Sequence, residues 1–135
     1  GLGLLEVETT MARRKRLAPV EGRHAASGEP VRGYEMHMGV TEGPALARPF
    51  LVVGGRGEGA ASADGRILGT YMHGLFAADG FRRAFLAGLG ARARAAARYE
   101  VEVEAALDAI ADGLERALDL DALLACAGSV TTAIR

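Results

Sequence analysis

A strict alternation of residue types at positions 31–40 limits the possible folds of this chain more than any other feature. One set of alternate positions contains Tyr34, Met36 and Met38, and the set between them contains Glu35 and His37. Because successive side chains of a strand point to opposite faces, this period of two predicts a strand with one apolar and one polar face. The polar face needs hydrogen-bond partners wherever it is buried.

Other strand signals surround this segment. Short apolar runs at residues 2–7, 17–20 and 50–53 indicate further strands. The glycine-rich residues 54–59 predict a loop, residues 23–30 a turn, and the basic residues 13–16 either a solvated loop or the start of an edge strand. The first 90 residues are therefore expected to be mainly strands and loops.

A hairpin turn is predicted at Asp64-Gly65, because this pair tolerates positive φ angles. The strand that follows it, residues 66–72, stops at His73-Gly74. The imidazole of His73 is thereby predicted at a strand end, beside a residue with no side chain. Ligands of open α/β sheets bind at such ends.

The last third of the chain predicts helices. One is expected from Asp79 or Gly80 to about residue 90, and a short one over residues 122–127, with Asp119 or Asp121 as its cap. A longer helix from about Glu100 carries one apolar stripe, formed by Val103, Leu107, Ile110, Leu114 and Leu118. We expect an α/β fold in which a mixed sheet is covered by the two C-terminal helices.

Composition excludes several classes of function. The 135 residues carry 16 basic and 17 acidic side chains, which argues against a nucleic-acid surface built from excess positive charge. Trp is absent and aromatic residues make up only 5% of the chain, so a base-stacking platform is not expected. The N-terminus does not resemble a signal peptide, and no apolar run is long enough to span a membrane. One cysteine fits a reducing compartment, and we expect a cytoplasmic protein.

The chemistry-bearing residues supply a base without a nucleophile. His73 is the candidate base, whereas the single thiol, Cys126, ends an apolar helix and is expected to be buried and inert. His24 is expected to be solvated. Metal-binding motifs are absent, so no metal is expected; a small metal-dependent hydrolase using Glu35, His37 and His73 is the weaker alternative.

Three ordered sequence blocks resemble the glutaminase part of cobyric acid synthases. The blocks are Gly1-Leu2-Gly3-Leu4-Leu5-x-Val7-x-Thr9-Thr10-Met11, Val31-x-Gly33-Tyr34-Glu35-Met36-His37-Met38-Gly39-x-Thr41, and residues 64–76, which contain Tyr71-Met72-His73-Gly74. Residues 118–124 also resemble the C-terminus of that family. The resemblance implies part of a class I, triad-type glutamine amidotransferase with a flavodoxin-like fold.

The same resemblance implies a mechanism and its partners. In that family a glutaminase releases ammonia from glutamine, and a separate N-terminal domain uses ATP and Mg²⁺ to activate corrinoid carboxylates in cobalamin biosynthesis. The resemblance assigns the catalytic base to His73. Beside it, we consider Glu35, His37 and Tyr71 as supporting candidates. Many class I relatives place a Glu two residues after this His, where this chain has Leu75. A structural Glu35–His37 pair is the favoured alternative to a supporting role for Glu35.

The nucleophile of that family, a Cys in a glycine-rich elbow, comes before the first block and is not matched by any residue here. We therefore expect residues 1–127 to be the C-terminal part of a glutamine amidotransferase domain, with Gly1 as a cut site and residues 128–135 as a flexible tail. This piece alone is expected to be inactive, to need no cofactor, and to form a homodimer through an exposed sheet edge. The alternative is a non-catalytic binding domain that keeps the glutaminase scaffold.

Overall fold

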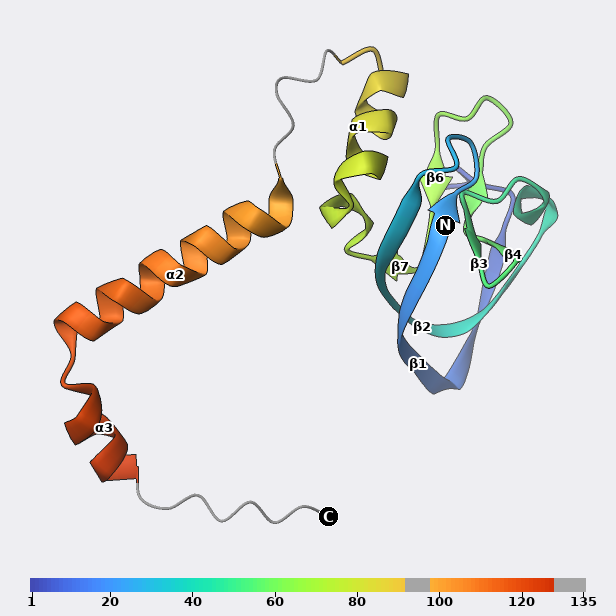
Figure 1. Ribbon diagram of the computed structural model, residues 1–135. Coiled ribbons are helices and arrows are strands. Elements are labelled where there is room, and N and C mark those ends of the chain that lie inside the picture. Colours follow the sequence, from blue (N-terminus) through green and yellow to red (C-terminus); the bar gives the residue numbers. More distant parts are fainter. Residues whose placement is uncertain (92–97, 128–135) are drawn as a thin grey trace. The chain divides into compact units, whose positions relative to one another are not determined.

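Two long antiparallel strands, β1 (Glu8–His24) and β2 (Pro30–Glu42), form the centre of the main sheet (Figure 1). The computed structural model describes residues 1–91 and 98–127. The chain divides into two units, Gly1–Ala97 and Arg98–Arg135, and the strands belong to the first. The strand predicted from the alternation at residues 31–40 is confirmed as β2.

Short strands complete two sheets. The main sheet has the order β4-β3-β1-β2-β7, so β7 lies at its edge, and β5 and β6 form a separate pair. These strands are β3 (Leu51–Val53), β4 (Arg56–Glu58), β5 (Ala60–Ala61), β6 (Leu68–Gly69) and β7 (Met72–His73). The predicted hairpin at Asp64-Gly65 is confirmed, because it joins β5 to β6. The α/β class is confirmed, and every strand pairing among the described residues is antiparallel.

Three local predictions were wrong. Residues 2–7 form no strand: the backbone there bonds to itself, with the Val7 amide donating to the Leu5 carbonyl. The basic run at residues 13–16 lies inside β1, and its first two residues fall within the register irregularity between Thr10 and Lys15. The supposed loop at residues 54–59 contains β4, because Gly54 and Gly55, both at positive φ, make the tight turn of a β3–β4 hairpin.

Helix α1 (Asp79–Gly88) packs its Phe81 into the core of the first unit, as the predicted helix at residues 79–90 requires. Two 3₁₀ turns, η1 (Pro44–Ala47) and η2 (Leu75–Ala77), lie before it in the chain. The core cluster is made of apolar side chains from the sheet, η2 and α1: Val31, Phe50, Leu51, Met72, Leu75 and Phe81.

His24 was expected to be solvated, and this was wrong: its side chain packs against the core. Its ring makes edge contacts with Phe50 and Phe81, at centroid distances of 5.3 and 5.2 Å. Its Nδ1 lies 2.7 Å from the Ser27 hydroxyl, and burial lowers the pKa of His24. A charged imidazolium is therefore less favourable in the folded chain than in the unfolded chain.

We expect the folded state to lose stability as the pH falls from 7 to 5. The unfolded state binds a proton at His24 near the ordinary value of 6.5, before the folded state does, so stability is present above that pH and declines below it. The free energy of unfolding, measured in urea at pH 7 and pH 5, checks this. His24→Asn, which keeps an acceptor near the Nδ1 position, is expected to reduce the difference, and an unchanged difference would contradict the assignment to His24.

In β2 the apolar face is exposed and the polar face is the more buried one. Tyr34, Met36 and Met38 are exposed, whereas Glu35 and His37 on the other face are half-buried. The reason is that Met72 of β7, the partner of Glu35 in the ladder, belongs to the core, so the core-facing side of β2 is the side of Glu35. The alternation predicted the two faces correctly and left open which one is covered.

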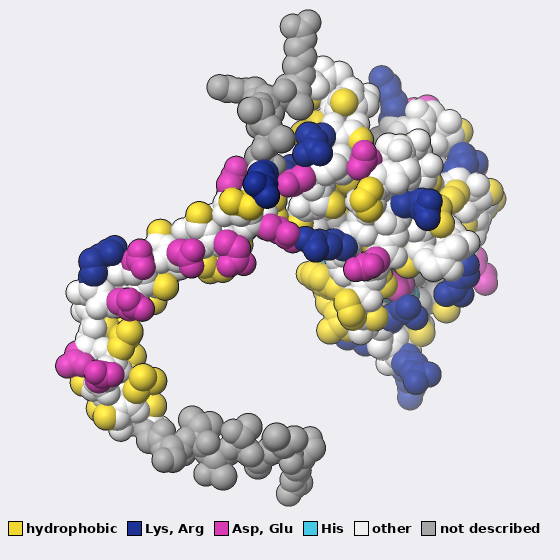
Figure 2. Space-filling model, in the orientation of Figure 1, with side chains coloured by type: hydrophobic (Ala, Val, Ile, Leu, Met, Phe, Trp, Pro, Cys, Tyr) yellow, Lys and Arg dark blue, Asp and Glu magenta, His cyan; other side chains and the backbone are white. Residues whose placement is uncertain are grey.

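The second unit contains α2 (Tyr99–Ala117) and α3 (Leu120–Ala127), as the apolar periodicity predicted. The Asp119 carboxylate accepts a hydrogen bond from the Ala122 amide at 3.0 Å and so acts as the expected cap. Both helices carry hydrophobic side chains at their surface (Figure 2), and none of their residues is buried. The covering of the sheet by these helices stays a prediction, as does the assignment of residues 1–127 to one domain. The predicted tail at residues 128–135 lies outside the described residues.

Cys126 was expected to be buried, and this was wrong: its thiol is exposed on α3. An apolar helix end buries a thiol only where another layer packs against it, and α3 has no buried residue. Within the described residues, no helix has the length and apolarity to cross a bilayer.

Candidate functional site

The candidate base, His73, is the last residue of β7 and is exposed, as the strand-end prediction requires. Its neighbour Met72 is 3% exposed and anchors the short strand in the core. Since side chains alternate along a strand, a buried Met72 turns His73 outward. Gly74 follows at φ 82°, in the left-handed region that suits glycine, and turns the chain away at once into η2.

The segment that leads into β7 is fixed by one carboxylate. Glu58 of β4 accepts hydrogen bonds from the Thr70 hydroxyl at 2.7 Å and from the Tyr71 amide at 2.8 Å. The Thr70 hydroxyl oxygen in turn accepts from the Met72 amide at 3.0 Å. Hydrogen bonds to a charged acceptor are stronger than neutral ones, so Glu58 holds the approach to His73.

Sequence reasoning missed Glu58, because it lies in the run 54–59 that was interpreted as a loop. The signal that could have found it is Gly54-Gly55, a pair typical of two-residue hairpin turns. A hairpin there puts Glu58 in a strand, two residues before the strand that pairs with β6.

A glycine, Gly33, lets strand β7 pair closely with β2. The ladder pairs Tyr34 with His73 and Glu35 with Met72. A Cβ atom on Gly33 would collide with the backbone carbonyl oxygen of His73 and would lie 3.3 Å from Cγ of Met72. Glycine at position 33 therefore permits a backbone approach that no other residue allows, and this approach sets the position of His73.

The ring of His73 is stacked on the ring of Tyr34. Their centroids are 5.1 Å apart and their planes differ by 9°. The two residues are cross-strand partners, so their side chains share one face of the sheet. Tyr34 is itself 44% exposed, so this stack lies at the surface.

The three supporting candidates lie together on the other face. Glu35 accepts a hydrogen bond from Nε of Arg16 at 2.6 Å, and its Oε1 lies 3.3 Å from Nδ1 of His37. This last contact is close but does not have the angles of a hydrogen bond, and the His37 Nδ1 is buried without another partner. The His37 ring stacks on Tyr71, with centroids 4.4 Å apart.

Tyr71 extends this group into a hydroxyl cluster. Its phenol oxygen lies 2.6 Å from Oγ1 of Thr41 and 3.3 Å from Oγ1 of Thr9, and the two threonine hydroxyls are 2.7 Å apart. All three residues line a hollow of about 250 Å³ between the sheet and the β5–β6 pair. The cluster ties β1, β2 and the segment before β7 together.

The structure thus brings Glu35, His37 and Tyr71 together and separates them from His73. Glu35 follows Tyr34 directly in β2 and so points to the opposite face from the stacked rings. No direct contact exists through which Glu35 could orient His73. The metal alternative also needed Glu35, His37 and His73 at one point, and the described residues contain no group of three His, Cys, Asp or Glu side chains that could hold a metal.

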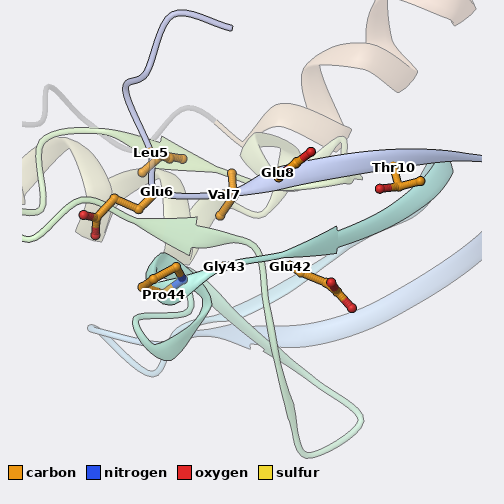
Figure 3. A pocket seen from close by; sticks show the side chains of 8 residues that line it. All are labelled: Leu5, Glu6, Val7, Glu8, Thr10, Glu42, Gly43 and Pro44. Atoms are coloured by element: carbon orange, nitrogen blue, oxygen red, sulfur yellow. The ribbon is translucent and has the colours of Figure 1, made fainter.

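A larger hollow, of about 550 Å³, lies at the beginning of β1 and does not include His73. Figure 3 shows that the carboxylates of Glu6, Glu8 and Glu42 there point away from one another. The rest of its lining consists of Leu5, Val7, Thr10, Gly43 and Pro44. This hollow adjoins the one lined by Tyr71, because Leu5 and Val7 line both, and it includes none of the candidate site residues.

Comparison with known proteins decides the family. The sequence model of the CobB/CobQ-like glutamine amidotransferase domain matches residues 1–81. The chain belongs to this amidotransferase family.

Curated relatives of this amidotransferase chain are cobyric acid synthases. It is 59% identical to the enzyme of Cereibacter sphaeroides over 127 residues, which are 94% of the chain and 26% of the relative. It is 53% identical to that of Hyphomonas neptunium, over 96% of the chain and 26% of the relative. The identity to that of Bradyrhizobium diazoefficiens is 50%, over 94% of the chain and 26% of the relative. The chain therefore spans about a quarter of the length of these relatives. No solved structure matches it.

One position of this amidotransferase chain has a structural role where the resemblance suggested a catalytic one. Leu75, two residues after His73, is 6% exposed and belongs to the core cluster. A carboxylate at this place would be buried among apolar side chains, at a high desolvation cost. Within residues 1–91 and 98–127, the ring nitrogens of His73 have no hydrogen-bond partner.

Proposed function

We propose that this chain is the part of a cobyric acid synthase glutaminase that carries its general base, His73. The observation that carries the proposal is an exposed imidazole at a strand end, with no hydrogen bond to its ring nitrogens from the described residues, in a chain 50–59% identical to cobyric acid synthases. The substrate of this site would be glutamine. The ammonia would serve the amidation of corrinoid carboxylates in cobalamin biosynthesis, in the cytoplasm.

In the proposed reaction, this chain contributes an imidazole that accepts a proton and gives it back. The imidazole takes the proton of a cysteine thiol, and the thiolate attacks the side-chain amide carbon of glutamine. The imidazolium then gives its proton to the departing nitrogen, so that ammonia leaves and a glutamyl thioester remains. Water, deprotonated by the same imidazole, cleaves the thioester and restores the thiol. The thiol would come from the part of the amidotransferase that the resemblance places before the first block.

ATP and Mg²⁺ belong, by the resemblance, to another domain. The described residues of this chain do not fit a metal site, since their carboxylates and imidazoles form no cluster of three. The steps assigned to this chain are therefore proton transfers only.

A hybrid enzyme tests the proposal directly. This chain replaces the matching 127 residues of the Cereibacter sphaeroides relative, and amidation is measured with glutamine or with ammonium as nitrogen source. We expect the hybrid to use both, and we expect the 135-residue chain alone to release no ammonia from glutamine. A hybrid that uses ammonium but not glutamine would overturn the proposal and favour a binding scaffold. Rapid glutamine hydrolysis by the chain alone would contradict the supply of the thiol from outside it.

The edge of the main sheet supports one further expectation, a homodimer of the chain. Strand β7 lies at this edge with one neighbour, β2, and unpaired edges favour pairing with another chain. Light scattering of the chain over a range of concentrations tests this, and a monomer throughout would contradict it.

A further inference from the structure

Among the described residues, the aromatic contact of the His73 ring is with Tyr34. Tyr34 stacks on one face of it at 5.1 Å and 9°, and neither ring nitrogen has a hydrogen bond. The position two residues later, Leu75, is turned into the core and cannot reach the imidazole as a carboxylate would. Among the described residues, the group placed to orient the imidazole is therefore an aromatic ring and not a carboxylate at position 75.

A stacked ring restricts an imidazole in a useful way. Parallel aromatic contact limits rotation about the Cβ–Cγ bond, because turning the ring loses contact area. It leaves both ring edges free, so either nitrogen can still accept or donate a proton. Orientation of a reacting group before the reaction is a large part of enzymatic rate acceleration.

We propose that Tyr34 is a positioning residue for His73, replacing an orienting carboxylate by an aromatic stack. The inference rests on the proposed role of His73 as the general base. Two features of the β2–β7 ladder support it: the register pairs Tyr34 with His73, and Gly33, next to Tyr34, lets the backbone of β7 lie close to β2. The phenol oxygen of Tyr34 makes no hydrogen bond within the described residues. The aromatic ring, and not the hydroxyl, is therefore the group that positions His73.

The test uses the hybrid enzyme with Tyr34→Leu and Tyr34→Phe. Leucine removes the flat ring, and we expect kcat for glutamine-dependent amidation to fall on the order of tenfold with KM for glutamine little changed. Phenylalanine keeps the ring and is expected to retain the parent rate. The ammonium-dependent rate is expected to stay the same in both variants. Met38→Ala, which removes an apolar side chain of similar exposure from the same face of β2, is the matched control and is expected to behave as the parent.

The outcomes separate this inference from the proposed function. If Tyr34→Leu keeps the parent kcat while loss of the His73 imidazole abolishes glutamine use, the positioning role is wrong and the base assignment stands. If glutamine use survives without the imidazole, the proposed function itself fails. Equal losses in Tyr34→Leu and Tyr34→Phe would assign the effect to the hydroxyl and overturn the stack. A parallel fall in the ammonium-dependent rate and in Tm would overturn the proposal by making Tyr34 a structural residue.

Discussion

In the hybrid enzyme, His73→Ala abolishes amidation with glutamine and leaves amidation with ammonium intact; this is the largest effect that we expect. The imidazole is the proposed carrier of the proton in every step of glutamine cleavage, and ammonium bypasses all of them. General acid–base catalysis by one residue contributes about 10² to 10⁴ in rate. Activation of the thiol is lost as well, so the rate of amidation with glutamine is expected to fall by about 10⁴ or more.

The control for His73→Ala is another histidine of the same chain. His24 lies among Phe50 and Phe81, away from the sheet edge that carries His73, so His24→Asn is expected to keep glutamine use. Initial rates with each nitrogen source, measured at pH 7 where the His24 effect on stability is small, give the comparison. Equal loss of both activities in His73→Ala would count against its role as the base.

The local parts of this site could be predicted from sequence. The hairpin at Asp64-Gly65, the strand end at His73 and the helix from Asp79 each depend on residues within about ten positions of one another. Turn chemistry and apolar periodicity act over such distances. His73 was therefore placed correctly at a strand end before its surroundings were known. The single strand predicted over residues 66–72 was wrong, because β6 and β7 are separate strands that pair in different sheets.

The partners of His73 could not be predicted in this way, because they depend on which strands pair. Tyr34 and His73 are neighbours only through the β2–β7 ladder. The alternation at residues 31–40 put Tyr34 and Glu35 on opposite faces but did not say which face His73 would share. Glu35 was considered as its partner because it is a carboxylate, whereas the register gives His73 an aromatic neighbour instead.

Burial was the second quantity that sequence could not decide. An apolar face is normally the covered one, yet the structure exposes Met36 and Met38 and half-buries Glu35 and His37. The polar face is tolerated there because its groups find close neighbours: Arg16 for Glu35 and the Tyr71 ring for His37. These contacts link residues 19 and 34 positions apart, beyond the reach of local patterns.

Gly33→Ala is expected to lower the rate with glutamine by about 10², less than loss of the imidazole does, although it changes no reacting group. The added methyl would meet the carbonyl oxygen of His73, so β7 must move away from β2. Such displacement separates the His73 and Tyr34 rings and shifts the imidazole from its working position. A misplacement of about 1 Å can cost on the order of 10² in rate.

Stability distinguishes this effect from that of His73→Ala. Overpacking at a backbone contact costs about 1–3 kcal/mol, so Gly33→Ala is expected to lower the free energy of unfolding by that amount. The exposed His73 side chain contributes little packing, and His73→Ala is expected to leave stability within about 0.5 kcal/mol of the parent. Urea unfolding of the two variants measures the difference.

The matched control is Gly88→Ala at the end of α1, where an added methyl has nothing within 4 Å and the backbone is helical. There alanine favours the helix, and both stability and glutamine use are expected to be kept or slightly raised. If Gly33→Ala keeps the parent rate with glutamine, the close approach of β7 to β2 does not set the position of His73. If it loses that rate and stability while His73→Ala loses the rate alone, the register of β2 and β7 is what turns a surface histidine into a positioned base.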